Sequence, residues 1–235
     1  MNDNQEAVEE PPVYLNGNFK QLHRLKKSDV PNSHEVFYIF DDASHPFTLQ
    51  YPMEIKIFNC KYASCQHYFL YNYLKHTGQE ELAHQVSNLR DSRSVNRIAA
   101  QCDFTNNEND WHHLASRWLI ETSFAKFRNS IYARERLFQT IGCTILFEDN
   151  NSKYLGVEIP EDTGDTLNPE SIQGKNVVGE CLMAVREYLL KDAEYAQEKI
   201  NAMQDSFALD IIPNIFDHAE MRTGRAYNRD RDRQQ

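Results

Sequence analysis

Cysteine is scarce in this sequence, and the few that occur form no recognisable pattern. There are five in 235 residues, an odd number without a CxxC pair, which argues against a disulfide framework. We therefore expect free thiols in an intracellular protein, either cytoplasmic or nuclear. No apolar stretch of a secretory signal follows Met1. No run approaches the ~18 apolar residues that a membrane helix needs, so we expect no membrane association.

An excess of positive charge is missing as well. The formal net charge is −10 and the sequence pI is about 5.4, which disfavours a broad surface for DNA or RNA. Two local basic segments are exceptions, residues 23–27 and the Arg-rich tail from Arg222 to Arg233. We interpret both as solvated surface. Nucleic-acid binding through the tail remains a weaker alternative.

The common signatures of metal and nucleotide chemistry are also absent. No HExxH, Walker A or GxSxG motif occurs. His112 and His113 are adjacent, and neighbouring side chains on a helix point about 100° apart, so we do not expect them to share a metal ion. The sequence thus predicts no metal site and no cofactor.

Apolar and aromatic residues are plentiful. Hydrophobic residues make up 40% of the chain, with thirteen Phe and twelve Tyr, enough for a well-filled globular core. Residues 1–33 lack apolar periodicity and read as a disordered N-terminal arm. We assign 34–203 to one domain and 204–235 to a C-terminal extension with a charged, disordered tail.

Periodicity within the domain alternates between short strands and longer helices. Strands are predicted at 35–40, 54–58, 143–147 and 154–159, where β-forming residues gather. Helices are predicted at 64–75, 80–89, 95–101, from Trp111 through Phe127, and at 132–141, with Asp110 as a candidate N-cap. A last helix is predicted from near Asn176 through Leu190, and the sequence leaves open whether it continues to about 203. The fold class is therefore α+β, a helix-rich single domain with a few short strands.

Three segments combine polar residues with glycines or aromatics at fixed spacing. The first, 62–69, places Gln66 and His67 before two aromatics, and the second joins Asp110-Trp111 to a Phe-Ala-Lys-Phe run containing Lys126. The third spans 174–186, where glycines allow close backbone approach and helix N–H groups attract anions. An ordinary helix start with tightly packed glycines is the preferred interpretation of the third segment by itself.

Taken together in order and spacing, the three segments resemble the NADAR family. The third is similar to that family's Gly-x-Asn-x-x-Gly-x-x-Leu-Met-x-x-Arg signature. NADAR proteins are similar to N-glycosidases that act on ribosides and ADP-ribose-type substrates, so the resemblance implies that fold and a ligand pocket. The ligand-binding candidates that it implies are Gln66, His67, Lys126, Asn176, Gly179 and Arg186.

Several positions depart from the family pattern. Gln66 stands where the family has Glu, Tyr73 where it has Lys, and Leu49 where it has Asn. Ser152 and Leu155 replace the Asp and Trp of an Asp-x-x-Trp-Gly motif. A glutamine amide cannot take up a proton at neutral pH and gives an oxocarbenium-like transition state no negative charge. These substitutions favour a catalytically degenerate pocket.

Our first functional hypothesis is accordingly a binding or scaffold module, a pseudoenzyme. Its ligand would be nucleotide-like or ADP-ribose-like, or a protein partner would bind the domain surface or the terminal arms. The alternative is an active N-glycosidase that cleaves a ribosylamine or an ADP-ribose adduct, with Asp149, Glu148 or Glu54 as the carboxylate. Nothing nearby marks a low pKa for Cys65, so we favour a structural thiol over a nucleophile. The aromatic run 68–73 is interpreted as core rather than a base-stacking surface.

Overall fold

The computed structural model describes residues 36–41, 43–104, 111–160 and 171–204. The N-terminal arm at 1–33, nearly all of the C-terminal extension and the candidate cap Asp110 lie outside these ranges. The assignment of 1–33, 34–203 and 204–235 as arm, domain and extension thus stays a prediction.

Within the described ranges, six short strands form three two-stranded sheets. Strand β1 (Val36–Phe40) pairs in parallel with β4 (Cys143–Phe147), and Phe40 lies opposite Phe147. Strands β2 (Ile55–Ile57) and β3 (Cys60–Tyr62) form an antiparallel hairpin, as do β5 (Val157–Glu158) and β6 (Gln173–Gly174). The sequence analysis did not predict β3 or β6, since residues 60–62 and 173–174 lie outside the runs of β-forming residues that indicated the other strands.

Helices account for most of the described residues. They are α1 (Cys65–His76), α2 (Glu80–Asn88), α3 (Ser92–Ala99), α4 (His112–Asn129), α5 (Ile131–Gln139), α6 (Val177–Leu189), the 3-10 helix η4 (Ala193–Tyr195) and α7 (Ala196–Gln204). The predicted helix-rich α+β class is confirmed. The helix predicted from near Asn176 through Leu190 is observed as α6, and only its suggested continuation to about 203 is not one unbroken helix. Helix α6 ends at Leu189, and the Asp192 carboxylate caps the following turn by accepting a hydrogen bond from Glu194 N.

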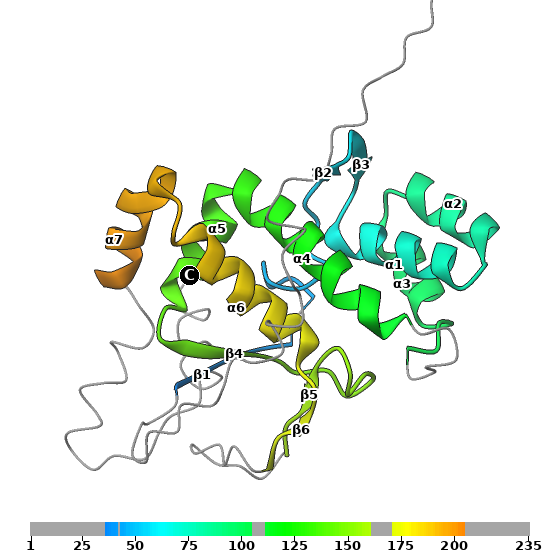
Figure 1. The fold of residues 1–235 in the computed structure, drawn as a ribbon. Coiled ribbons are helices and arrows are strands. Elements are labelled where there is room, and N and C mark those ends of the chain that lie inside the picture. Colours follow the sequence, from blue (N-terminus) through cyan, green and yellow to red (C-terminus); the bar gives the residue numbers. More distant parts are fainter. Residues whose placement is uncertain (1–35, 42, 105–110, 161–170, 205–235) are drawn as a thin grey trace, which may run out of the picture.

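Helix α4 is central to the packing. It contacts α1 along one side and α6 along another, while α6 in turn covers β4 (Figure 1). Helices α2 and α3 gather around α1 at one end, and α5 and α7 pack together at the other. Because α4 is covered on more than one face, polar side chains such as Thr122, Ser123 and Lys126 are buried along with its apolar ones.

Aromatic side chains fill the core between α1 and α4. Phe69 packs edge-on against Trp111 and Trp118, and Tyr73 packs edge-on against Trp111 with ring centroids 5.2 Å apart. Tyr68 donates to the buried carboxylate Glu121 at 2.5 Å. Most of the run 68–73 is therefore core.

The described residues were also searched for membrane-spanning helices, disulfides and metal-binding groups. None of the helices in the described ranges has the length and apolar character needed to cross a bilayer. Within those ranges the cysteines carry free thiols, and His, Cys, Asp and Glu side chains do not gather into a metal-binding group.

Candidate functional site

A cavity of about 640 Å³ opens where the beginning of α1, the end of α3 and the end of β4 meet. The turn at Leu49–Gln50 and the segment 148–155 complete its wall, together with Phe104. This volume lies within the range of small-molecule sites, roughly 300–1,000 Å³. Its wall combines apolar rings with several polar side chains, so it is the main candidate for a ligand site.

Gln66 contributes a buried amide to this wall. It is the second residue of α1, its side chain is 7% exposed, and its backbone N–H donates to Leu49 O at 2.8 Å. The Oε1 atom has no hydrogen-bond partner among the described residues. Leaving a buried amide oxygen unpaired costs about 1–3 kcal/mol.

Four acidic side chains also line the cavity: Asp41, Asp103, Glu148 and Asp149. Three of them, Asp41, Glu148 and Asp149, directly follow the parallel strands β1 and β4. Because the carboxyl ends of parallel strands lie at the same edge of a sheet, these residues come close together. Backbone bonds hold this edge, with Glu148 N donating to Phe40 O and Asp149 N donating to Val157 O, both at 3.0 Å. No Lys or Arg occurs among the described residues of the wall.

Glu54, the third carboxylate considered from the sequence, does not line the cavity. It forms an exposed ion pair with Lys61 at 2.8 Å, and its hydrogen bond and attraction to that lysine lower the pKa of its carboxyl group. The structure thus brings only Glu148 and Asp149 of those three candidates to the cavity.

The other positions at which the resemblance implied a changed residue lie in or near the same cavity. Leu49, Ser152 and Leu155 line it, while Tyr73 does not. Ser152 is buried, and its Oγ accepts from Leu155 N at 3.2 Å, which closes a local turn. Tyr73 braces the wall from behind, since its hydroxyl donates to the backbone oxygen of Asp103 at 3.0 Å.

His67 and Cys65 flank Gln66 in sequence, but the structure does not place them on the cavity wall. His67 Nδ1 is hydrogen-bonded to Ser64 Oγ at 2.8 Å, and Nε2 has no partner among the described residues. Burial, aided by the charge of Arg90, lowers the pKa of His67. Cys65 is buried and donates to Thr122 O at 3.6 Å, so its thiol has a structural contact.

Lys126 lies in the core beneath the cavity rather than in its wall. Its Nζ donates to Thr48 O at 2.8 Å and sits 5.1 Å from the centre of the Tyr51 ring. Burial lowers the pKa of this amine. Its bond to Thr48 and the bond from Gln66 N to Leu49 O hold neighbouring carbonyls of one turn, which fixes Leu49 at the cavity wall.

The start of α6 is held against β4 by Asn176 and Gly179. Asn176 adopts a left-handed backbone conformation with φ of 53°, donates through Nδ2 to Ile145 O at 2.8 Å and accepts at Oδ1 from Phe147 N at 3.0 Å. A Cβ on Gly179 would lie 2.3 Å from Ile145 O, so only glycine allows this approach. Neither residue lines the cavity.

The backbone N–H groups that open α6 are also engaged. Val177 N donates to Tyr154 O at 3.3 Å and Val178 N donates to Leu155 O at 2.9 Å. An anion site at this helix terminus would need those groups free. The sequence-based suggestion of anion binding therefore finds no support in these two N–H groups.

Arg186 is buried at the junction of α5 and β4. One terminal guanidinium nitrogen, Nη1, donates to Thr140 O at 2.6 Å, to Thr140 Oγ1 at 3.0 Å and to Cys143 O at 3.0 Å. These bonds satisfy carbonyl groups left over where α5 ends. The structure thus places Arg186, like Asn176 and Gly179, in contacts that join secondary-structure elements.

The signature Gly174–Arg186 forms the junction of α6 with β4. The NADAR domain profile matches residues 29–190. The chain belongs to the NADAR domain family. An NMR structure of the E. coli protein YbiA shares the fold at a TM-score of 0.51 and 19% sequence identity, covering 67% of this chain and 86% of that one. A search of curated proteins gives no match.

This NADAR domain belongs to a family of N-glycosidase-like proteins linked to ADP-ribose and riboflavin intermediates. Some cavity residues were not identified from its sequence, namely Asp41, Asp103 and Asn96. Asp41 follows β1 as Glu148 follows β4, so pairing of the two predicted strands would have indicated it. Asp103 and Asn96 carry no comparable sequence signal.

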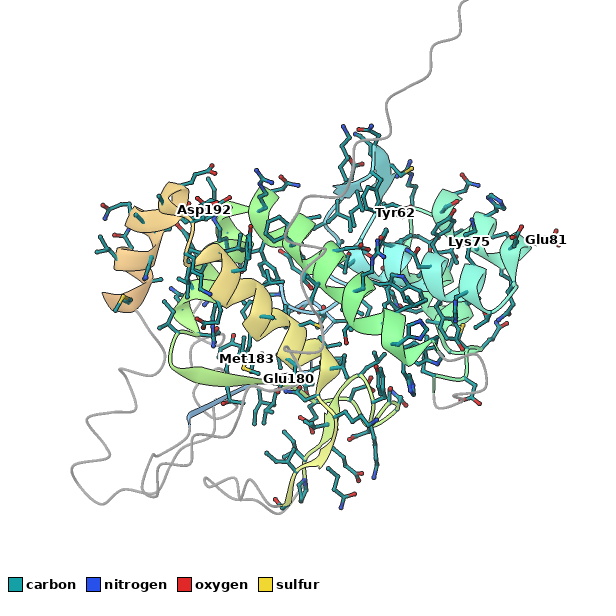
Figure 2. The ribbon with its side chains drawn as sticks, viewed as in Figure 1. Tyr62, Lys75, Glu81, Glu180, Met183 and Asp192 are labelled. Carbon is teal, nitrogen blue, oxygen red and sulfur yellow. The ribbon has the colours of Figure 1, made fainter. Side chains whose placement is uncertain are left out.

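A second cavity of about 530 Å³ lies on the NADAR domain beside α4 and α6. Tyr154 stacks on His112 there, with ring centroids 3.7 Å apart, and Lys175 and Glu180 are also part of the wall. Figure 2 labels Glu180 at the beginning of α6. Burial raises the pKa of its carboxyl group.

Proposed function

We propose that this NADAR domain is a binding module that holds a riboside-type ligand in the 640 Å³ cavity without cleaving it. The observation that carries the proposal is Gln66. Its buried amide lines the cavity with Oε1 unpartnered, at the position where the family resemblance implies a catalytic glutamate. The side chain can hydrogen-bond a ligand but cannot act as an acid or a base.

The chemistry of N-glycosidic cleavage explains why this substitution matters. Positive charge develops on the ribose ring in the transition state, and a nearby carboxylate stabilises that charge or activates water. Gln66 supplies no charge, and Ser152 Oγ already accepts a hydrogen bond from Leu155 N. Leu49 and Leu155 add apolar surface rather than acid–base groups. Of these cavity positions, Gln66 and Ser152 keep a hydrogen-bonding group, and none keeps a group for proton transfer.

Binding and turnover can be measured on the same preparation of the full chain. We expect adenosine and related ribosides to raise the melting temperature and to bind in calorimetry, with no release of base. Gln66→Ala removes the amide and should weaken binding about five- to tenfold, the value of roughly one hydrogen bond. Gln85→Ala, an exposed position on α2, is the matched control and should leave affinity unchanged. Base release at enzyme-like rates would refute the proposal.

A second candidate is an active N-glycosidase with relocated acid–base groups. It is favoured by the presence of Glu148 and Asp149 in the same cavity as Gln66. Glu148→Gln and Asp149→Asn should then abolish base release without destroying the fold. Unchanged turnover in both variants would exclude these two carboxylates.

A scaffold role for a protein partner stays a prediction from the sequence. A protein partner would bind the outer surface of the domain or its terminal arms, whereas a small ligand would bind in the cavity. Cross-linking of the full chain and of a chain lacking the terminal segments, compared in the same extract, would test it. Equal cross-linking in both would exclude the arms.

A further inference from the structure

The 530 Å³ cavity beside α4 and α6 is separate from the 640 Å³ cavity, since the two share no described lining residue. The α6 residues that line it lie on one face of that helix: Val177, Glu180, Cys181 and Ala184. The α4 residues that line it also lie on one face: His112, His113, Ser116 and Ile120. Because α4 and α6 pack together, the cavity is a groove between two facing helices. Its volume falls within the range of small-molecule sites, roughly 300–1,000 Å³.

The groove offers apolar surface on both helices. Ile120 contributes from α4 and Ala184 from α6, and both are partly exposed, whereas Cys181 is buried. The Cys181 thiol donates to Ser116 O at 3.7 Å, which joins the two helices at the groove. Burial raises the pKa of this thiol, so it carries no charge at neutral pH. A ligand can therefore place a hydrocarbon group against both helices and release water from their apolar surface.

Tyr154 and Lys175 complete the wall from outside the two helices. The Tyr154 hydroxyl donates to His112 O at 2.8 Å, and its ring stacks on the His112 ring. Lys175 follows β6, and its backbone N–H donates to Lys153 O at 2.7 Å. Its Nζ lies 5.3 Å from the centre of the Tyr154 ring. These contacts place an ammonium group beside an anchored aromatic ring.

Glu180 and Lys175 bring opposite charges to the same groove without pairing. They form no ion pair with each other, and neither has another ion-pair partner among the described residues. Glu180 is partly exposed and has no hydrogen-bond partner for its carboxylate in that part of the chain. Burial raises the pKa of this carboxyl group, since the carboxylate has lost contact with water that no protein cation replaces. A ligand with an ammonium group would supply the missing contact.

The two charged groups flank the beginning of α6, with Lys175 before the N-cap Asn176 and Glu180 in the first turn. One small molecule can therefore reach both. We propose that the groove is a second ligand site, which binds an α-amino acid with an apolar side chain. The ammonium group of the ligand pairs with Glu180, and its carboxylate pairs with Lys175. Its side chain lies against Ile120 and Ala184.

Three small molecules with one hydrocarbon skeleton separate these contacts in the test. Leucine carries both charged groups, isopentylamine carries only the ammonium group, and isocaproate carries only the carboxylate. Titration calorimetry with the full chain at neutral pH should rank leucine first, isopentylamine second and isocaproate last, because Glu180 is less exposed than Lys175. Each lost ion pair should weaken binding about five- to tenfold, roughly the value of one charge-assisted hydrogen bond in a partly exposed site.

Variants assign each charge of the ligand to a residue. Glu180→Gln keeps the shape but removes the charge, so it should weaken leucine and isopentylamine about tenfold and should not weaken isocaproate. Because the lost charge is unpaired, this variant should fold with an unchanged or higher melting temperature. Lys175→Met should weaken leucine but not isopentylamine. Glu81→Gln removes a charge from an exposed position on α2, labelled with Glu180 in Figure 2, and should change none of the affinities.

Several outcomes would overturn the amino-acid site. Leucine that binds no more tightly than isocaproate, or equally well to Glu180→Gln, would remove Glu180 as its partner. Leucine that binds no more tightly than isopentylamine would remove Lys175. No binding of the three molecules at millimolar concentration would exclude the site altogether. Each result is independent of riboside binding, because Glu180→Gln should leave the affinity for adenosine unchanged and Gln66→Ala should leave that for leucine unchanged.

Discussion

Replacing Asn176 tests whether the family signature of this chain acts in structure or in ligand binding. The side chain joins α6 to β4 through two hydrogen bonds, one to Ile145 O and one from Phe147 N, at 2.8 and 3.0 Å. Its backbone is left-handed, with φ of 53°. Asn176→Ala removes both bonds and also places alanine in a left-handed conformation that favours asparagine or glycine.

The expected loss follows from these three contributions. Two backbone groups left unpaired cost about 1–3 kcal/mol each, and the left-handed conformation costs alanine about 1 kcal/mol. We therefore expect Asn176→Ala to lower the free energy of unfolding by about 3–7 kcal/mol. Asn176→Gly loses the same bonds but keeps the backbone conformation, so it should be more stable than the alanine variant by about 1 kcal/mol.

Equilibrium unfolding in urea, followed by tryptophan fluorescence, measures both variants. Trp111 and Trp118 are buried in the core and report its loss. The structural interpretation requires a large loss of stability in both variants and the stated order between them. Stability within about 0.5 kcal/mol of the unmodified chain, together with loss of riboside binding, would refute it and assign Asn176 to the ligand.

Three further substitutions test other contacts. Burial lowers the pKa of Lys126, so the unfolded chain binds the proton of this amine more tightly than the folded chain does. The free energy of unfolding of the unmodified chain should therefore rise from neutral pH toward about pH 10. In Lys126→Met this rise should be smaller. Glu198→Gln breaks the paired bonds with Arg134, both 2.7 Å, and should cost about 1–2 kcal/mol with faster amide exchange in α7. Gln66→Glu places a carboxyl group in a buried, acidic site, so its pKa should be raised and the variant should be less stable at pH 7 than at pH 5.

Each of these substitutions has an outcome that would contradict its reasoning. Parallel stability curves of the unmodified chain and Lys126→Met in urea titrations would show that the amine is not desolvated. Unchanged exchange in α7, measured by mass spectrometry, would remove Arg134 and Glu198 as its anchor. Equal stability of Gln66→Glu and the unmodified chain across that pH range would place position 66 in contact with water.

Long, regular elements were predictable from local patterns. The strand at 143–147 was placed with its observed bounds, and the helix expected at 64–75 is observed at 65–76. Helix α5 ends at Gln139, and Gly142, with φ of 83°, lies in the left-handed turn that leads into β4. The β2–β3 hairpin was missed because Phe58 and Asn59, rather than an Asn-Gly pair, supply the left-handed turn.

The sequence by itself determined the family and the fold class, because these depend on residue identity and spacing along the chain. Only the tertiary structure decided which polar residues meet. It brought Gln66, Glu148 and Asp149 to one cavity and turned Asn176 and Arg186 into contacts between elements. The physical reason is that the hydrogen-bond partners of a polar side chain depend on which backbone groups nearby are left unpaired. Those groups belong to residues that are distant in sequence.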